Sequence, residues 1–177
     1  MDITITEALA EVPTIGKRIA KKQQFVQDFL ARQAIVRDPH EKEGGSVELI
    51  RRELQGIADL EQRLIDIRSG IARSNAVTKI TIGDTTRTVT DWLTWRREIA
   101  EGQRSRMNNM AGALRQLRAK AQQTNGKVGE NVDGPTDWVI NINERQLADQ
   151  IEALETTLGS LDGQLSLRNA TTTITLP

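Results

Sequence analysis

The chain has 177 residues, 37% hydrophobic and 27% charged, which is typical of a globular protein with one domain. Lys and Arg together number 24, as do Asp and Glu, so no net charge indicates nucleic acid or an anionic membrane as the partner. Cys is absent, which excludes disulfide bonds and thiolate zinc sites.

The first predicted elements are a short strand and a long helix. Residues 2–5 alternate in the manner of a strand, and Thr4 with Glu7 has the spacing of a capping box, in which each residue satisfies a free backbone N–H of the other. A helix should therefore begin just after Thr4. Pro13 should kink or divide this helix, because proline removes a backbone donor and clashes with the preceding turn.

A loop and a second long helix follow. The dipeptides Asp38-Pro39 and Gly44-Gly45 bracket the loop, since both disfavour helix, and Ser46 is expected to cap the second helix. Apolar residues then recur in steps of three and four, as one stripe of a helix requires. The members of this stripe are Ile57, Leu60, Leu64, Ile67 and Ile71.

A hairpin should link the two halves of the chain. The segment "VTKITIGDTTRTV" alternates in period two on both sides of Gly83-Asp84, and Gly in the first position suits a two-residue type II′ turn. Thr88 with Asp91 then has capping-box spacing, and another long helix follows. Beyond it, a longer loop includes a possible strand at residues 138–142.

The last helix should begin after Asn143, which with Gln146 forms another capping pair. Its stripe repeats the earlier one at an offset of 94, and "NAVTKITI" at 75–82 recurs as "NATTTITL" at 169–176. The members of this second stripe are Ile151, Leu154, Leu158, Leu161 and Leu165. The helices that open the two halves agree with an offset of 84, which pairs Leu9 with Leu93, Ile15 with Ile99, Val26 with Met110 and Leu30 with Leu114.

These repeats predict a mainly α fold made of two tandem strand-helix-helix-strand units, residues 1–83 and 84–177, within a single domain 1–177. The segment 91–123 carries seven basic and three acidic residues, and 144–168 carries two basic and five acidic ones, so these helices should pair antiparallel. Because one hairpin alone cannot bury its stripe, we expect an antiparallel four-helix, coiled-coil-like bundle with a small β-hairpin or sheet at one end.

The order of several short sequence motifs along the chain resembles that in the septicolysin-like family of small bacterial helical proteins. The resemblance covers nearly the whole chain and includes "EAL" (7–9), "GDTTRTVTDWLTWRRE" (83–98) and "LDGQLSLRNATTTITL" (161–176). It implies a self-associating, hexameric helical protein with no established activity. The Thr-rich final strand and Pro13 depart from the family's pattern.

Candidate catalytic residues are few. His40 beside Glu41 and Glu43 is the only histidine, and in a charged loop we expect it to be solvated rather than to bind a metal. Gly126-Lys127 lacks the Ser or Thr of a phosphate loop. Acidic pairs, Asp59 with Glu61 and Glu152 with Glu155, are expected on solvated helix faces. We therefore predict no enzyme activity, no cofactor and no metal.

The basic helix 91–123 is the main alternative site. Its cations, with Trp92 and Trp95 at its start, could bind nucleic acid. We expect them instead to meet the acidic partner helix, with at least one Trp packed between the helices and the hairpin. The cations are Arg96, Arg97, Arg104, Arg106, Arg115, Arg118 and Lys120.

The functional expectation is a non-enzymatic protein that assembles with itself. Thr-rich alternating termini suit the addition of a strand to a sheet edge, so the terminal strands could pair with each other within one chain or with neighbouring copies, and we predict that they link copies. The assembly residues are Ile3, Ile5, Thr171, Thr173, Ile174, Thr175 and Leu176. A phage capsid or tail accessory protein is the specific expectation, and a free cytosolic homo-oligomer is the alternative. Without a signal peptide or a long apolar run, we expect a virion or cytoplasmic location and no membrane partner.

Overall fold

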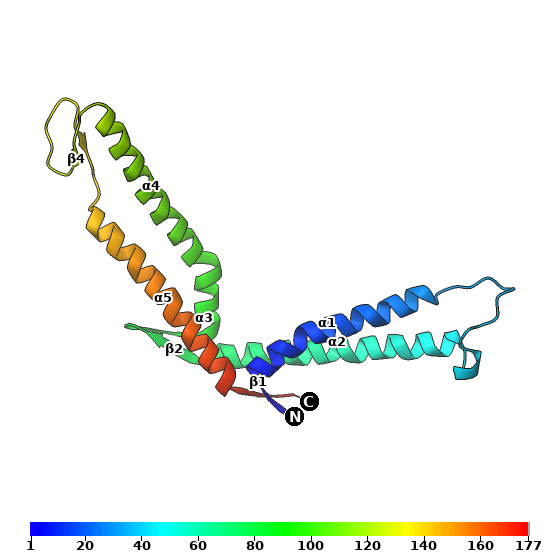
Figure 1. Ribbon diagram of the computed structural model, residues 1–177. Coiled ribbons are helices and arrows are strands. Elements are labelled where there is room, and N and C mark those ends of the chain that lie inside the picture. The colour runs from blue at the N-terminus through cyan, green and yellow to red at the C-terminus, as the bar shows by residue number, and fades with distance from the viewer. Residues whose placement is uncertain (177) are drawn as a thin grey trace. The chain divides into compact units, whose positions relative to one another are not determined.

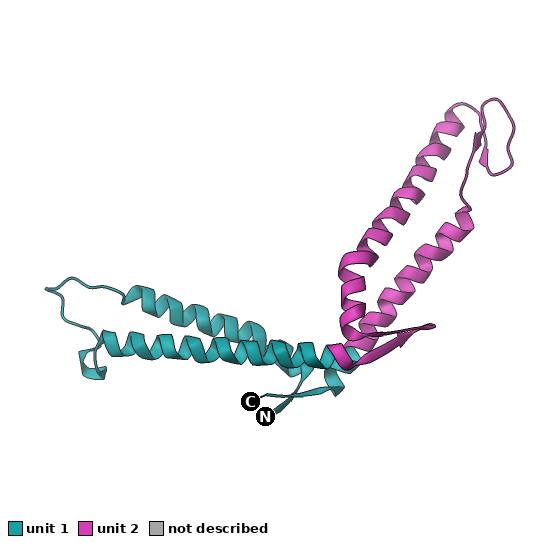
Figure 2. Ribbon diagram, turned by 180° about the vertical axis from the view of Figure 1, so that it is seen from behind, with its two compact units in different colours: residues 1–75, 166–177 teal, residues 76–165 magenta. Residues whose placement is uncertain are grey.

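The computed structural model describes residues 1–176, which are mainly helical and carry three sheets of two strands each. The chain divides into two compact units. Unit 1 comprises Met1–Asn75 and Ser166–Pro177, and unit 2 comprises Ala76–Leu165 (Figure 2). Each pair of helices packs mainly on itself and on its own small sheet, and the single domain that the sequence predicts stays a prediction.

Unit 1 is a helical hairpin closed at its base by a two-stranded sheet (Figure 1). Helices α1 and α2 are antiparallel, because Glu11 on α1 pairs with Arg63 and Lys22 farther along pairs with Glu53. The elements of this unit are β1 (Asp2–Thr4), α1 (Ile5–Asp28), the 3-10 turn η1 (Glu41–Glu43), α2 (Ser46–Val77) and β6 (Thr173–Thr175).

The start of α1 agrees with the predicted capping box. The Glu7 N–H donates to Thr4 Oγ1 at 3.2 Å, and the Thr4 N–H donates to Glu7 Oε2 at 2.8 Å. Ile5 is the first residue of the helix rather than the end of the strand. Pro13 does not divide α1, which runs unbroken past it with Pro13 on the exposed side, where solvent can satisfy the carbonyl that proline leaves free.

The loop between α1 and α2 is organised by Asp38. The Ser46 hydroxyl and N–H donate to its two carboxylate oxygens at 2.6 and 2.9 Å, and the His40 N–H donates to Oδ1 at 2.9 Å. These hydrogen bonds lower the pKa of Asp38 to about 2, the Ser46 hydroxyl contributing most. Ser46 is therefore the first residue of α2 and a donor to Asp38, not the side-chain acceptor that a helix cap requires.

Unit 2 repeats this plan with longer connections. Its helices are also antiparallel, since Arg96 pairs with Asp162 and Arg118 pairs with Glu144. The elements are β2 (Lys79–Ile82), β3 (Thr85–Thr88), α3 (Val89–Thr94), the π-helical segment η2 (Trp95–Ala100), α4 (Glu101–Gln123), β4 (Val128–Gly129), β5 (Trp138–Val139) and α5 (Glu144–Thr171). The strand expected at 138–142 is limited to β5, which pairs in parallel with β4.

The linking hairpin has the predicted turn. Lys79 through Ile82 pair with Thr85 through Thr88 in antiparallel register, which leaves Gly83 and Asp84 as the turn. Gly83 has φ +55°, as the first position of a type II′ turn needs, and a side chain there would be strained.

The π-helical segment changes the register of the repeat. A π-helical turn accommodates one extra residue, so beyond η2 the helices match with an offset of 85 rather than 84. Ile15 is 2% exposed and the predicted partner Ile99 is 49% exposed, whereas Ala100 is 1% exposed. The predicted pairs of Ile15 with Ile99, Val26 with Met110 and Leu30 with Leu114 are therefore wrong by one residue. The pairs that agree in burial are Ile15 with Ala100, Val26 with Ala111 and Phe29 with Leu114.

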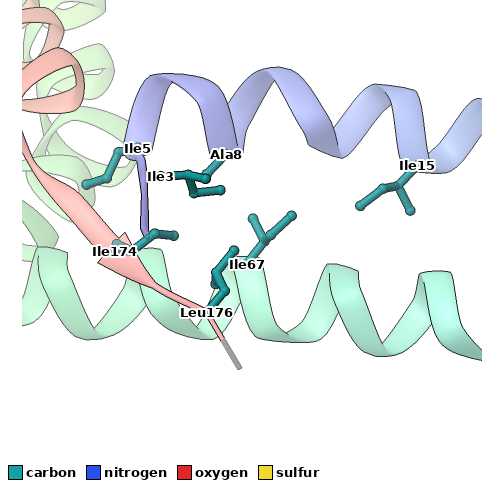
Figure 3. Packing of buried hydrophobic residues seen from close by; sticks show 7 residues of the cluster. All are labelled: Ile3, Ile5, Ala8, Ile15, Ile67, Ile174 and Leu176. Atoms are coloured by element: carbon teal, nitrogen blue, oxygen red, sulfur yellow. The ribbon is translucent and has the colours of Figure 1, made fainter. Parts of the chain in front are cut away.

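Each unit has a small core where its helices meet its sheet. In unit 1 this core contains Ile5, Ala8, Ile67 and Ile174, with Ile3, Ile15 and Leu176 added (Figure 3). In unit 2 it contains Val89, Trp92, Leu161 and Ile80. The four members of the second core are the repeat equivalents of the first four. Every stripe residue of α2 and α5 is buried or half-buried, so the stripes lie where the sequence predicts.

Strand pairing exchanges the ends of the two repeats. Each repeat has a leading strand before its first helix, β1 or β3, and a trailing strand after its second helix, β2 or β6. Trailing β2 pairs with leading β3 of the other repeat, and trailing β6 pairs with leading β1 of the other repeat. Each unit is therefore completed by a strand that the other repeat supplies.

Candidate functional site

The terminal sheet, formed by β1 and β6, joins the two ends of the chain. Ile3 lies opposite Ile174, with Asp2 opposite Thr175 and Thr4 opposite Thr173. Beyond the strands, the Met1 ammonium donates to the Leu176 carbonyl and the Leu176 N–H donates to the Met1 carbonyl, both at 2.9 Å. The strands expected to pair between copies are thus paired within the chain.

Side chains of the terminal sheet alternate between core and solvent. Ile174 and Leu176 are buried against Ile67, whereas Thr173 and Thr175 are exposed. The contact is close because Gly70 on α2 faces them, and a Cβ added there would lie 3.2 Å from Ile174 Cδ1 and 3.5 Å from Leu176 Cδ2. Of the predicted assembly residues, Ile5 and Thr171 belong to helices instead, as the first residue of α1 and the last of α5.

The terminal sheet has the same construction as the central hairpin, formed by β2 and β3. The Ile5 N–H donates to the Thr172 carbonyl at 3.0 Å, and the Val89 N–H donates to the Thr78 carbonyl at 2.8 Å. These bonds occupy equivalent positions at the start of α1 and of α3, the first helix of each repeat. The two sheets differ in one respect: a two-residue turn connects the strands of the central hairpin, whereas no turn joins those of the terminal sheet, which lie at opposite ends of the chain.

Trp92 anchors the central hairpin to unit 2. It is buried, and its indole N–H donates to the Ile80 carbonyl at 3.0 Å. Trp95 lies edge-on to it, with ring centroids 5.4 Å apart, and the Arg87 guanidinium lies over the Trp92 ring at 5.1 Å. This placement agrees with the expectation that a Trp packs between helices and hairpin. The repeat equivalent of Trp92 in unit 1 is Ala8.

The basic helix meets the acidic helix through three of its arginines. Arg96 pairs with Asp162 at 2.6 Å, Arg104 with Glu155 at 2.8 Å and Arg118 with Glu144 at 2.6 Å. Of the other predicted cations, Arg97 donates to the carbonyl of Leu93, and the Lys120 ammonium lies over the Trp138 ring at 4.9 Å. Within residues 1–176, neither Arg106 nor Arg115 makes a salt bridge.

Two hollows lie along the line of contact, here called the seam, between α5 and the helix formed by η2 and α4. The first hollow, about 380 Å³ in volume, has Ala100 on one wall and Gly159 on the other. The second hollow, about 210 Å³, has Ala111 and Ala148 in the corresponding places. Sequence reasoning missed both, because they depend on the register shift at η2, which places small residues where unit 1 has Ile15 and Val26.

His40 is not a solvated loop residue. Its ring packs against Phe29 and Phe25, with centroids 4.6 and 5.6 Å away, and its Nδ1 lies 3.5 Å from Glu43 Oε2. Its Nε2 is buried without a hydrogen-bond partner in the described structure. The prediction of a solvated side chain is therefore wrong, because the 3-10 turn folds the loop back over the end of α1. A shallow hollow of about 600 Å³ lies near this loop, lined by residues such as Arg32, Ile35 and Glu41.

Other candidate chemical groups remain dispersed. Across residues 1–176, no group of three or more His, Asp or Glu side chains is placed to hold a metal ion. The acidic side chains Asp59, Glu61, Glu152 and Glu155 are all exposed, as expected for solvated helix faces. Within the same residues, no helix combines the length and apolar character that crossing a membrane requires.

Comparisons with known proteins show the fold alone. No protein-family model and no curated protein matches the chain, so the resemblance to septicolysin-like proteins stays a prediction. A solved structure of a functionally unknown conserved protein from Corynebacterium diphtheriae is similar, with a TM-score of 0.55 and 20% sequence identity. The match covers 99% of this chain and 100% of that one, so the similarity extends over the whole arrangement of elements.

Proposed function

We propose that this protein is a non-enzymatic structural protein that assembles with copies of itself by exchanging its C-terminal strand. The observation that carries the proposal is the terminal sheet. It repeats the contacts of the central hairpin but has no turn that joins its two strands directly. The β6 of one copy can therefore pair with the β1 of the next through the same hydrogen bonds that it makes within its own chain.

The closed and the exchanged arrangements make the same contacts at the terminal sheet. Exchange keeps the burial of Ile174 and Leu176 and the bonds made by Met1 and Ile5, so neither closed nor exchanged form gains contacts at this sheet. Concentration and the remaining surfaces of the helices then decide between them. Head-to-tail exchange closes into a ring when the rotation per copy allows it, and a hexamer is the ring that the resemblance implies.

The helices supply the remaining driving force. Six of the ten stripe residues of α2 and α5 are only half-buried in their own units. Packing two hairpins side by side in a four-helix bundle would cover these half-buried stripes. The favourable free energy is about 25 cal/mol for each Å² of apolar surface removed from water. The bundle that the sequence predicts is thus part of this proposal.

A pair of cysteines tests the exchange. The chain has no Cys, and Asp2 lies opposite Thr175, whose hydroxyl donates to the Asp2 carboxylate at 2.7 Å. Oxidised D2C/T175C should give a ladder of disulfide-linked multimers on a non-reducing denaturing gel. The matched control is T81C/T86C on facing positions of the central hairpin, which should link within one chain. A D2C/T175C product that is only an internally linked monomer would contradict the exchange.

The biological setting of such an assembly has two versions. One is a phage capsid or tail accessory protein, which should co-sediment with particles, and the other is a free cytosolic homo-oligomer, which should not. Nucleic-acid binding by the basic helix is disfavoured because Arg96, Arg104 and Arg118 are already paired with acidic residues of α5. Tight, salt-dependent binding to single-stranded nucleic acid that is lost in R104A/R106A would favour that alternative instead.

A further inference from the structure

The helix formed by η2 and α4 carries two apolar faces that are one residue out of phase. Ala100 and Ala111, here called the small pair, lie in the seam with α5 and line the two hollows. Ile99 and Met110, here called the large pair, precede them by one residue each and are 49% and 37% exposed. The register that the structure adopts therefore turns the larger apolar side chains to solvent, where their exposure is unfavourable.

The hollows lie where the large pair is missing. Unit 1 has Ile15 and Val26 at the places that the small pair occupies in unit 2, and Ile15 is 2% exposed. The methyl side chains of the small pair leave hollows of about 380 and 210 Å³ there. A shift of the helix by one residue would bring the large pair into these places, and the apolar seam of unit 2 would then match that of unit 1.

The π-helical segment η2 provides the means for such a shift. Its extra residue is held by hydrogen bonds alone, so it can pass from one turn to another along the helix. If it passes to the turn at Gly112, residues 99–110 rotate by about 100° and advance by about 1.5 Å, whereas Leu114 and the residues beyond it stay in place. Gly112 suits the extra residue because glycine destabilises regular α-helix. We infer that this helix has two registers, and that the second places the large pair in the seam and fills both hollows.

The second register has identifiable costs. The salt bridge between Arg104 and Glu155 is lost, but both side chains are about half-exposed, so it contributes little. The salt bridge of Arg118 lies beyond the shifted residues and is kept. Arg106, which makes no salt bridge within residues 1–176, takes the half-buried place of Met107, where its stem can pack while the guanidinium reaches solvent. These costs make the second register a minor state, with a population of about 0.1 to 10%.

A pair of cysteines tests whether the large pair reaches α5. Ala100→Cys with Gly159→Cys places both thiols on the walls of the first hollow, so this pair should close an internal disulfide in the first register. No heavy atom outside the helix backbone lies within 4 Å of a Cβ added at Gly159, so the thiol has room. Ile99→Cys with Gly159→Cys should close only in the second register. In dilute protein under the same oxidising conditions, mass spectrometry should show it forming about 10 to 1,000 times more slowly, in proportion to the population.

Deletion of Arg97 is the decisive control, because it removes the extra residue whose movement produces the second register. It should leave the disulfide of A100C/G159C unchanged and slow that of I99C/G159C to the rate of E98C/G159C, whose first cysteine faces α5 in neither register. The inference is overturned if I99C/G159C closes no faster than E98C/G159C, if it closes equally fast with and without Arg97, or if A100C/G159C does not close. The reaction lies within one chain, so its result is independent of the proposed self-assembly.

Discussion

Ile67 and Leu161 lie 94 positions apart in the sequence, and each is fully buried, at 0% exposed, in the core of its own unit. Each packs where a leading helix begins and a trailing strand from the other repeat arrives. The two residues are therefore the same structural position occupied twice, and they are the points at which the repeat is easiest to test.

Truncation of either residue should be equally costly. Ile67→Ala and Leu161→Ala should each lower the free energy of unfolding by about 2 to 5 kcal/mol, because each leaves a cavity under a sheet. Denaturant unfolding followed by circular dichroism measures this loss. Ile65→Ala, at an exposed position of the same helix as Ile67, should change it by less than about 0.5 kcal/mol. A similar loss at Ile65 would show that the described burial is wrong.

Gly70 should be intolerant of larger side chains. A leucine there would clash with Ile174 and Leu176, so G70L should release β6 and lower the thermal stability of unit 1. Gly16→Ala on α1 is the comparison, because its added Cβ meets no atom within 4 Å and should stabilise the helix by about 0.5 to 1 kcal/mol. Thermal unfolding followed by circular dichroism distinguishes the two, and a stabilising G70L would contradict the close packing of β6.

Trp92 should report on the central hairpin. Trp92→Phe removes the hydrogen bond to the Ile80 carbonyl and leaves that buried acceptor unpaired, at a cost of about 1 to 3 kcal/mol. All three Trp residues lie in unit 2, so fluorescence of the remaining two follows the unfolding of that unit. Trp138→Phe, at a partly exposed position, is the control and should be nearly neutral.

Removing one residue from η2 should be tolerated. Deletion of Arg97 should convert the π-helical segment to regular α-helix and leave the seam from Ala100 to Ala121 in phase. The same deletion at Arg106, inside regular α4, should rotate every later seam residue away from α5 and destabilise unit 2 strongly. Fluorescence-monitored unfolding compares the two variants, and equal losses would contradict the inserted residue.

The loop of unit 1 should lose stability in acid, because protonation of Asp38 weakens the hydrogen bonds that its carboxylate accepts. Its pKa is lowered from 3.8 to about 2 in the folded chain, so its contribution is complete above about pH 4 and is lost as the pH falls toward 2. Asp38→Asn should reduce thermal stability at neutral pH and flatten the acid dependence in that window. Asp59→Asn, on an exposed helix face, is the control. An acid profile of D38N that matches the wild-type profile would contradict this role.

The sequence alone determined the repeat, the helical stripes, the capped start of α1 and the turn at Gly83. These features depend on near neighbours, because apolar spacing, capping distance and the conformational freedom of glycine act within a few residues. The antiparallel pairing of α4 with α5 was also predictable, since their opposite charges are visible in the composition of each segment.

Tertiary structure alone decided that β1 and β6 pair within the chain and where α4 contacts α5 in unit 2. Ile3 and Ile174 are at opposite ends of the sequence, and no short-range sequence pattern predicts that they pair. The extra residue at η2 is also not predictable from the sequence, because a single insertion leaves the composition and the apolar spacing on each side of it unchanged. Its effect appears only in packing, where Ala100 replaces Ile99 in the seam and opens the first hollow.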